Sequence, residues 1–144
     1  MIEQDTVRLL RECDAGAKMG VDAFADVMDR VKDRGLKELL SDSQKEHETL
    51  SHVIKDQLHR FGDLGKEPPA MASAISWLKT QAEMMMDPAD HTVADLMTDG
   101  CDMGVKSLSK YLNKYKAADE KSKDCAKKLI AMEARLAQSL RPYL

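Results

Sequence analysis

The six-residue pattern G-x-x-M-G-V occurs twice in this chain, first at 16–21 and again at 100–105. Each copy lies inside a long stretch of helical periodicity, where a glycine costs about 1 kcal/mol relative to alanine. Four glycines at matching places therefore need a structural reason, and the close approach of neighbouring helices supplies one. The repeat predicts that the chain contains two copies of one helical hairpin.

Apolar residues recur every three or four positions over four long segments, as in helices that bury one face. The first hairpin is expected over about 3–62, with Gly35 as the C-terminal cap of its first helix. The second hairpin is expected over about 90–144, where Asp119 or Ser122 is the candidate N-cap of the last helix. When the two copies are aligned on their glycines and shifted slightly at the turn, the positions of the second helices also correspond.

A crossover over about 63–89 joins the two hairpins. It begins with two glycines and two prolines and then carries a short segment of helical spacing, which predicts one additional helix on the outside of the bundle. Methionine is adaptable and suits binding surfaces. We therefore take the large side chains of this segment as the candidate partner surface: Met71, Trp77, Met84, Met85 and Met86.

The composition fits one helical domain over 1–144, with 43% apolar and 33% charged residues. A net charge of −3 gives no electrostatic footprint for nucleic acid or for an anionic membrane surface. No apolar run approaches the roughly 20 residues of a membrane span. The first residues carry acids and lack the pattern of a secretory signal, so a cytoplasmic location is expected.

The three cysteines, Cys13, Cys101 and Cys125, are widely spaced and lie within helical patterns. No C-x-x-C pair is present, which disfavours a zinc site or a disulfide framework. We expect reduced thiols in or near the core.

Several segments resemble small bacterial ferritin-like proteins, whose own activity is not established. They are 11–21, 65–68, 76–79 and the run from 95 through 112. The resemblance covers most of the chain and implies an all-α, ferritin-like four-helix bundle. In that architecture two antiparallel hairpins are joined by a crossover that runs the length of the bundle.

Ferritin-like metal enzymes hold two irons with a glutamate from each of two helices and a Glu-x-x-His from each of the others. No glutamate of this chain is followed three residues later by histidine, and the nearest relatives are Gln44-x-x-His47 and Asp56-x-x-His59. Glycines stand where the first and third helices would need inward glutamates. A di-iron site is therefore not expected, and no cofactor is predicted.

His47 lies on the apolar stripe of its helix, and the hairpin alignment places Glu133 at the equivalent position of the last helix. A buried histidine needs a hydrogen-bond partner, so a His47–Glu133 bond in the core is the favoured interpretation. The alternative is a degenerate metal site in which His47, Glu46 and Glu133 hold iron or manganese.

Two further groups of polar residues are weaker candidates. Glu12, Asp56 and His59 would form at best half a metal site, and the acidic run on the third helix suggests a solvated face. The sequence thus favours a non-catalytic protein that acts through contacts with a protein partner or as a homodimer. The competing hypothesis is a metal-binding protein with an oxidative or storage role.

Overall fold

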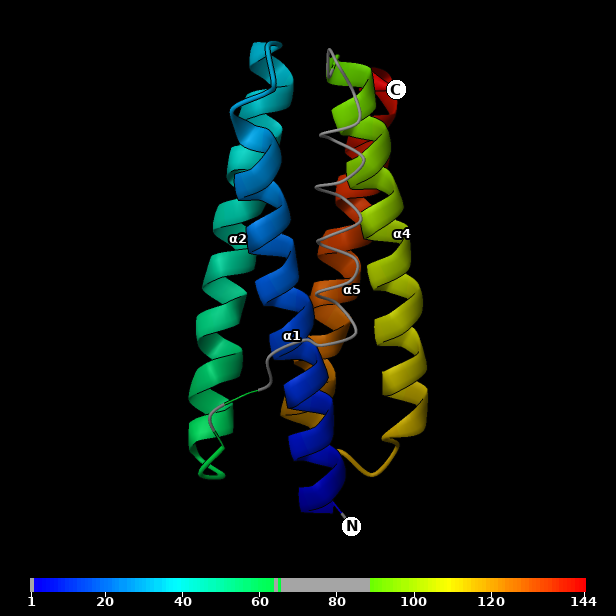
Figure 1. Cartoon of the computed structure of the whole chain (residues 1–144). Helices are drawn as coiled ribbons and strands as arrows, with labels where there is room; N and C mark the ends of the chain where they lie inside the picture. Colours follow the sequence, from blue (N-terminus) through cyan, green and yellow to red (C-terminus); the bar gives the residue numbers. More distant parts are fainter. Residues whose placement is uncertain (1, 64, 66–88) are drawn as a thin grey trace.

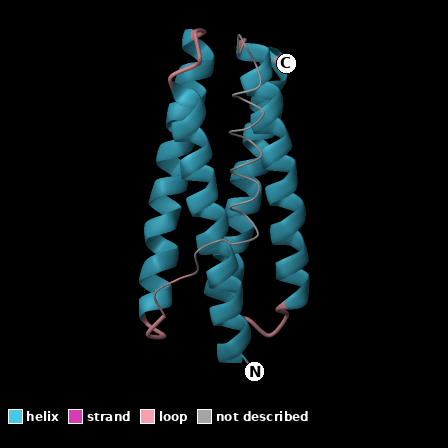
Figure 2. Ribbon diagram, viewed as in Figure 1, coloured by secondary structure: helices cyan, strands magenta, loops and turns pink. Residues whose placement is uncertain are grey.

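The computed structural model describes residues 2–63, 65 and 89–144 of the chain. These residues form four long α-helices, and in the part so described there is no β-strand (Figures 1 and 2). The prediction of an all-α fold is confirmed. The helices, followed by one short 3-10 turn, are α1 (Ile2–Met28), α2 (Arg34–His59), α4 (Asp90–Lys114), α5 (Glu120–Leu140) and η1 (Arg141–Tyr143).

The four helices form a bundle in which neighbours along its perimeter run antiparallel. In Figure 1, α1 and α5 rise from the end marked N, whereas α2 and α4 descend toward it. Helix α1 packs on α2, α4 and α5, and helix α5 also packs on α2 and α4. The diagonal between α1 and α5 is therefore the one along which two parallel helices lie in contact.

Aspartates begin the second helix of each hairpin. The Asp33 carboxylate accepts the Leu36 amide at 2.9 Å, and the Asp119 carboxylate accepts the Ser122 amide at 2.8 Å. Each satisfies an amide that the first turn of a helix leaves without a helical partner. Of the two residues that the sequence offers as caps for α5, the structure selects Asp119.

Gly35 is not the C-terminal cap that the sequence predicts. Helix α1 already ends at Met28, and Gly35 lies in the first turn of α2 without a positive φ. A Cβ atom at this position would lie 2.7 Å from the Tyr143 hydroxyl oxygen. A larger residue here would have to displace the Tyr143 hydroxyl, which lies against the start of α2.

Two contacts tie the start of each hairpin to the turn of the other one. At one end of the bundle, the Asp90 carboxylate accepts the backbone amides of Lys32 and Asp33 at 2.8 and 2.7 Å. At the opposite end, the Thr6 hydroxyl accepts the backbone amide of Asp119 at 2.8 Å. We call these contacts the Asp90 clamp and the Thr6 clamp.

The interior of the bundle contains two apolar clusters, with a polar layer between them. The first cluster lies toward the Thr6 clamp and comprises Leu9, Leu10, Cys13, Ala17, Leu50, Ile54, Leu58, Leu108, Ala118, Cys125, Ala126 and Leu129. The second lies toward the Asp90 clamp and comprises Phe24, Val27, Val31, Leu36, Leu40, Val93, Ala94, Met97, Cys101, Leu136 and Leu140. All three cysteines are buried and unbridged, as predicted.

The crossover helix expected between Pro69 and Asp87 lies outside the described residues, and so does its candidate partner surface. In the part of the chain that the structure describes, no helix combines the length and the apolar character that a membrane span requires.

The Asp90 clamp predicts a loss of stability when its carboxylate is removed. In the Asp90→Ala variant the amides of Lys32 and Asp33 lose a charged acceptor, so the free energy of unfolding should fall by about 1–2 kcal/mol. Asp95→Ala, on an exposed part of the same helix, is the matched control and should change it little. Equal losses in urea unfolding of the two variants would contradict this role of the clamp.

Candidate functional site: a buried histidine–glutamate pair

The predicted pair of His47 and Glu133 forms the centre of the polar layer. The imidazole Nε2 lies 2.8 Å from the Glu133 Oε1 atom, and Nδ1 lies 2.7 Å from the Ser43 carbonyl oxygen. His47 is 1% exposed and Glu133 is 9% exposed. The Phe24 ring meets the imidazole edge-on, with 5.0 Å between the ring centroids. Both nitrogens of the ring are therefore occupied within the protein.

The partners of the imidazole determine where its hydrogens lie. The Ser43 carbonyl can only accept a hydrogen bond, so Nδ1 carries a hydrogen and donates it. Nε2 and the Glu133 carboxylate then share one proton, because their contact requires one donor and one acceptor. The pair consequently holds a single proton in the core, as an ion pair or as a neutral imidazole with a carboxylic acid.

The electrostatics favour the charged imidazolium. Burial lowers the pKa of His47, but the hydrogen bond that the imidazolium donates to Glu133 and the negative charge of that carboxylate together outweigh it and raise the pKa, with smaller contributions from the Ser43 carbonyl and Glu46. The pKa of His47 therefore lies above its ordinary value of 6.5. A buried charge is tolerated only with such a partner, since an unpaired ion in the core costs several kcal/mol.

The repeated glycines make room for this pair. A Cβ atom on Gly20 would lie 2.9 Å from the Cδ2 atom of His47, closer than real Cβ contacts allow. On α4, a Cβ atom on Gly104 would contact the Glu133 carboxyl carbon at 3.6 Å, which is an ordinary distance. Close approach is therefore the reason for Gly20, whereas Gly100 has no atom within 4 Å of its missing Cβ.

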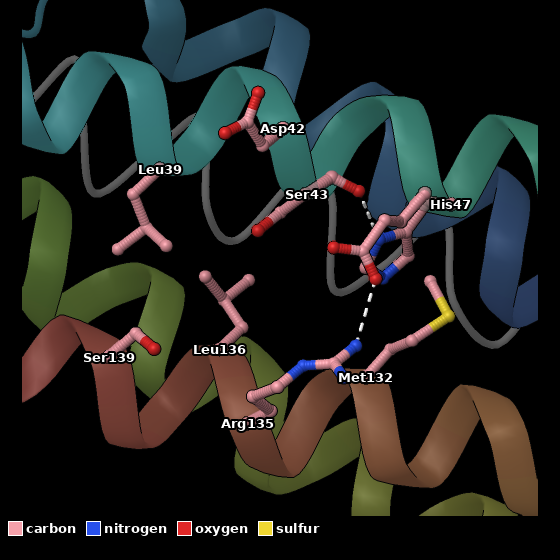
Figure 3. Close-up of a pocket in the computed structure, with 9 residues that line it drawn as sticks. Leu39, Asp42, Ser43, His47, Met132, Arg135, Leu136 and Ser139 are labelled. Carbon is pink, nitrogen blue, oxygen red and sulfur yellow. Dashed lines mark hydrogen bonds and ion pairs between the residues drawn. The ribbon is translucent and has the colours of Figure 1, made fainter.

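A cavity of about 210 Å³ opens between α2 and α5 beside the pair. Figure 3 shows Ser43 and His47 on α2 facing Arg135 and Leu136 on α5 across this space. The exposed guanidinium of Arg135 lies 2.8 Å from the carboxylate of Glu46, so this ion pair bridges the two helices. Glu46 thus pairs with arginine and does not join His47 and Glu133 in one ligand set.

A smaller cavity, of about 40 Å³, lies on the other side of the pair between α1 and α4. Its lining includes Gly20, Cys101 and Glu133, and its volume suits one water molecule. Burial and the Glu133 carboxylate raise the pKa of the Cys101 thiol. Burial also raises the pKa of Cys13 and of Cys125. A raised pKa removes the thiolate that nucleophilic or redox cysteine chemistry requires.

The remaining sequence candidates do not converge. Asp56 and His59 are exposed on α2, whereas Glu12 is half-buried on α1. The acidic residues Asp95 and Asp102 are exposed, which agrees with the expected solvated face. Among residues 2–63, 65 and 89–144, no group of three histidine, cysteine, aspartate or glutamate side chains could hold a metal ion.

Arg135 and the two clamps are the features of the layer and its surroundings that sequence reasoning missed. An arginine on an exposed helix position gives no signal of its partner, because Glu46 lies 89 residues away in the chain. Comparison with family models, with curated proteins and with solved structures finds no match for this chain.

Gly20 and Gly100 differ in the space around their missing Cβ atoms, so the same substitution should have opposite effects at the two positions. Gly20→Ala should lower the free energy of unfolding by about 1–3 kcal/mol, because the imidazole is held by two hydrogen bonds and cannot move away. Gly100→Ala should instead raise it by up to about 1 kcal/mol, since alanine favours the helix and meets no neighbour. Thermal and urea unfolding measure both effects. A Gly20→Ala variant more stable than the native chain would contradict the close approach of Gly20 to His47.

The raised pKa of His47 predicts how stability depends on pH. Between pH 6.5 and the higher folded pKa, the native chain binds more protons than the unfolded chain, so the free energy of unfolding falls as the pH rises. The contribution of His47 is complete below pH 6.5 and is lost as the pH passes the folded pKa. The stability difference between the native chain and His47→Gln, measured by urea unfolding, should shrink over that window. An equal difference at every pH would contradict the raised pKa.

Proposed function

We propose that this protein is a ferritin-like bundle of two repeated hairpins that has no catalytic metal centre and acts through contacts with other proteins. The observation that carries the proposal is the mutual hydrogen bond of His47 and Glu133 in the middle of the bundle. Ferritin-like metal enzymes place their ligands at that level. Here the two side chains satisfy each other.

Matching contacts in the two hairpins support the repeated architecture. In the alignment set by the glycines Thr6 corresponds to Asp90, and after the small shift at the turn that aligns the second helices Asp33 corresponds to Asp119. Thr6 accepts the amide of Asp119, and Asp90 accepts the amide of Asp33. In both clamps the start of one hairpin therefore accepts a backbone amide from the turn of the other hairpin. Both aspartates also cap the helix that follows them.

The donor set does not fit a di-iron centre. The helices α1 and α4 present Gly20 and Gly104 to the layer in place of inward carboxylates. Both nitrogens of His47 are engaged with protein acceptors, and Glu46 is paired with Arg135. A metal ion would have to break each of these contacts before it gained three ligands.

Metal binding by His47, Glu46 and Glu133 remains the alternative function, with iron or manganese as the ion. It is favoured by the fact that Glu46 and His47 line one cavity and that His47 contacts Glu133. Elemental analysis of protein purified with added iron or manganese tests the two functions. We expect no stoichiometric metal; a stoichiometric ion that His47→Ala abolishes and exposed His52→Ala retains would establish the alternative.

The partner surface is proposed from the sequence pattern of the crossover, namely Met71, Trp77, Met84, Met85 and Met86. Its helical spacing of large apolar residues suits association with a second copy or with another protein. Sedimentation over a wide concentration range should show self-association that Trp77→Ala weakens. A chain that stays monomeric at every concentration would contradict the homodimer.

A further inference from the structure

The two clamps hold the hairpins together without distinguishing one hairpin from the other. Thr6 and Asp90 occupy equivalent positions, and each accepts a backbone amide from the turn of the opposite hairpin. A hydroxyl and a carboxylate are both acceptors, and every turn offers an amide. Two copies of the first hairpin, or two copies of the second, would therefore still offer an acceptor to a turn amide at each end, although the Asp5 carboxylate, which accepts the Ala117 amide at 3.0 Å, belongs to the first hairpin.

The polar layer does distinguish the hairpins. His47 and Glu133 occupy equivalent positions, yet one is a base and the other an acid, and together they share one proton. Two first hairpins would bring two imidazoles together, and two second hairpins would bring two carboxylates together. Each like pair would either carry a net charge in the core or hold one member far from its usual protonation state, and both are costly.

We propose that the His47–Glu133 pair is the specificity element by which the hairpin over 2–63 recognises the hairpin over 89–144. The face that each hairpin buries is then an interaction surface, and the partner it fits is the unlike hairpin, in the same chain or in a second copy that exchanges hairpins. This inference rests on the duplicated architecture proposed above. Gly20 lies against His47 and Gly104 lies against Glu133, so each side chain of the pair faces a glycine of its own hairpin.

Exchanging the two residues in the full chain tests the proposal. His47→Glu and Glu133→His each create a like pair and should lower Tm by about 10 °C. The double variant His47→Glu, Glu133→His restores an unlike pair and should recover most of that loss. A double variant no more stable than either single one would overturn the proposal. The exposed controls His52→Glu and Glu48→His should leave Tm unchanged.

Mixing the two single variants tests recognition between copies. When the His47→Glu and Glu133→His chains are unfolded and refolded together, exchange of hairpins creates two unlike pairs. We expect a 1:1 heterodimer by light scattering, with Tm close to that of the native chain, while each variant refolded alone gives none. A mixture that keeps the masses and Tm values of the separate variants would overturn recognition in trans.

An apolar pair separates specificity from stability. His47→Leu with Glu133→Leu removes the shared proton but fills the layer, so the chain should fold yet lose discrimination and refold to a mixture of oligomers. A single monomeric species would overturn the specificity role. The exchange is measured on metal-free protein, so its outcome is separate from that of the metal assay on the native chain. Bound metal would reject the proposed function, whereas failed exchange in metal-free protein would leave it standing.

Discussion

The hydrogen bond between His47 and Glu133 is the constraint to which the rest of the bundle is fitted. It places a shared proton between two apolar clusters, where both side chains are buried. The helix neighbours are adjusted accordingly. Gly20 gives space to the imidazole, the Ser43 carbonyl fixes its tautomer, and Phe24 covers its edge. Such a layer gives up hydrophobic packing for a defined pairing.

The fold and the centre of the site were predictable because their signals are local or periodic. Helical spacing located the four long helices, and the alignment of the two hairpins, shifted slightly at the turn, put His47 and Glu133 at equivalent heights. The end of α1 was not predictable in the same way. Gly35 is a strong local signal for a helix end, but the turn after Met28 is set by the Asp90 clamp, which comes from more than fifty residues away. Long-range tertiary contacts of this kind leave no periodic trace.

The surroundings of the pair were also beyond sequence reasoning. Glu46 was considered as a metal ligand because it is next to His47, yet successive helix residues point in different directions. In the structure Glu46 forms an ion pair with Arg135 on α5, at the surface of a cavity that adjoins the imidazole. Adjacency in the chain suggested one site, whereas the helix geometry separates an inner polar pair from an outer ion pair.

The clamps at opposite ends of the bundle fix the position of one hairpin along the other. A slide of one helical turn, about 5.4 Å, would break the hydrogen bonds at both ends together. The same slide would move His47 away from Glu133 and into an apolar cluster. Neighbouring helices that pack by apolar contacts alone could accept such a shift at modest cost. In this bundle three separate polar contacts oppose such a slide and fix the axial register of the two hairpins.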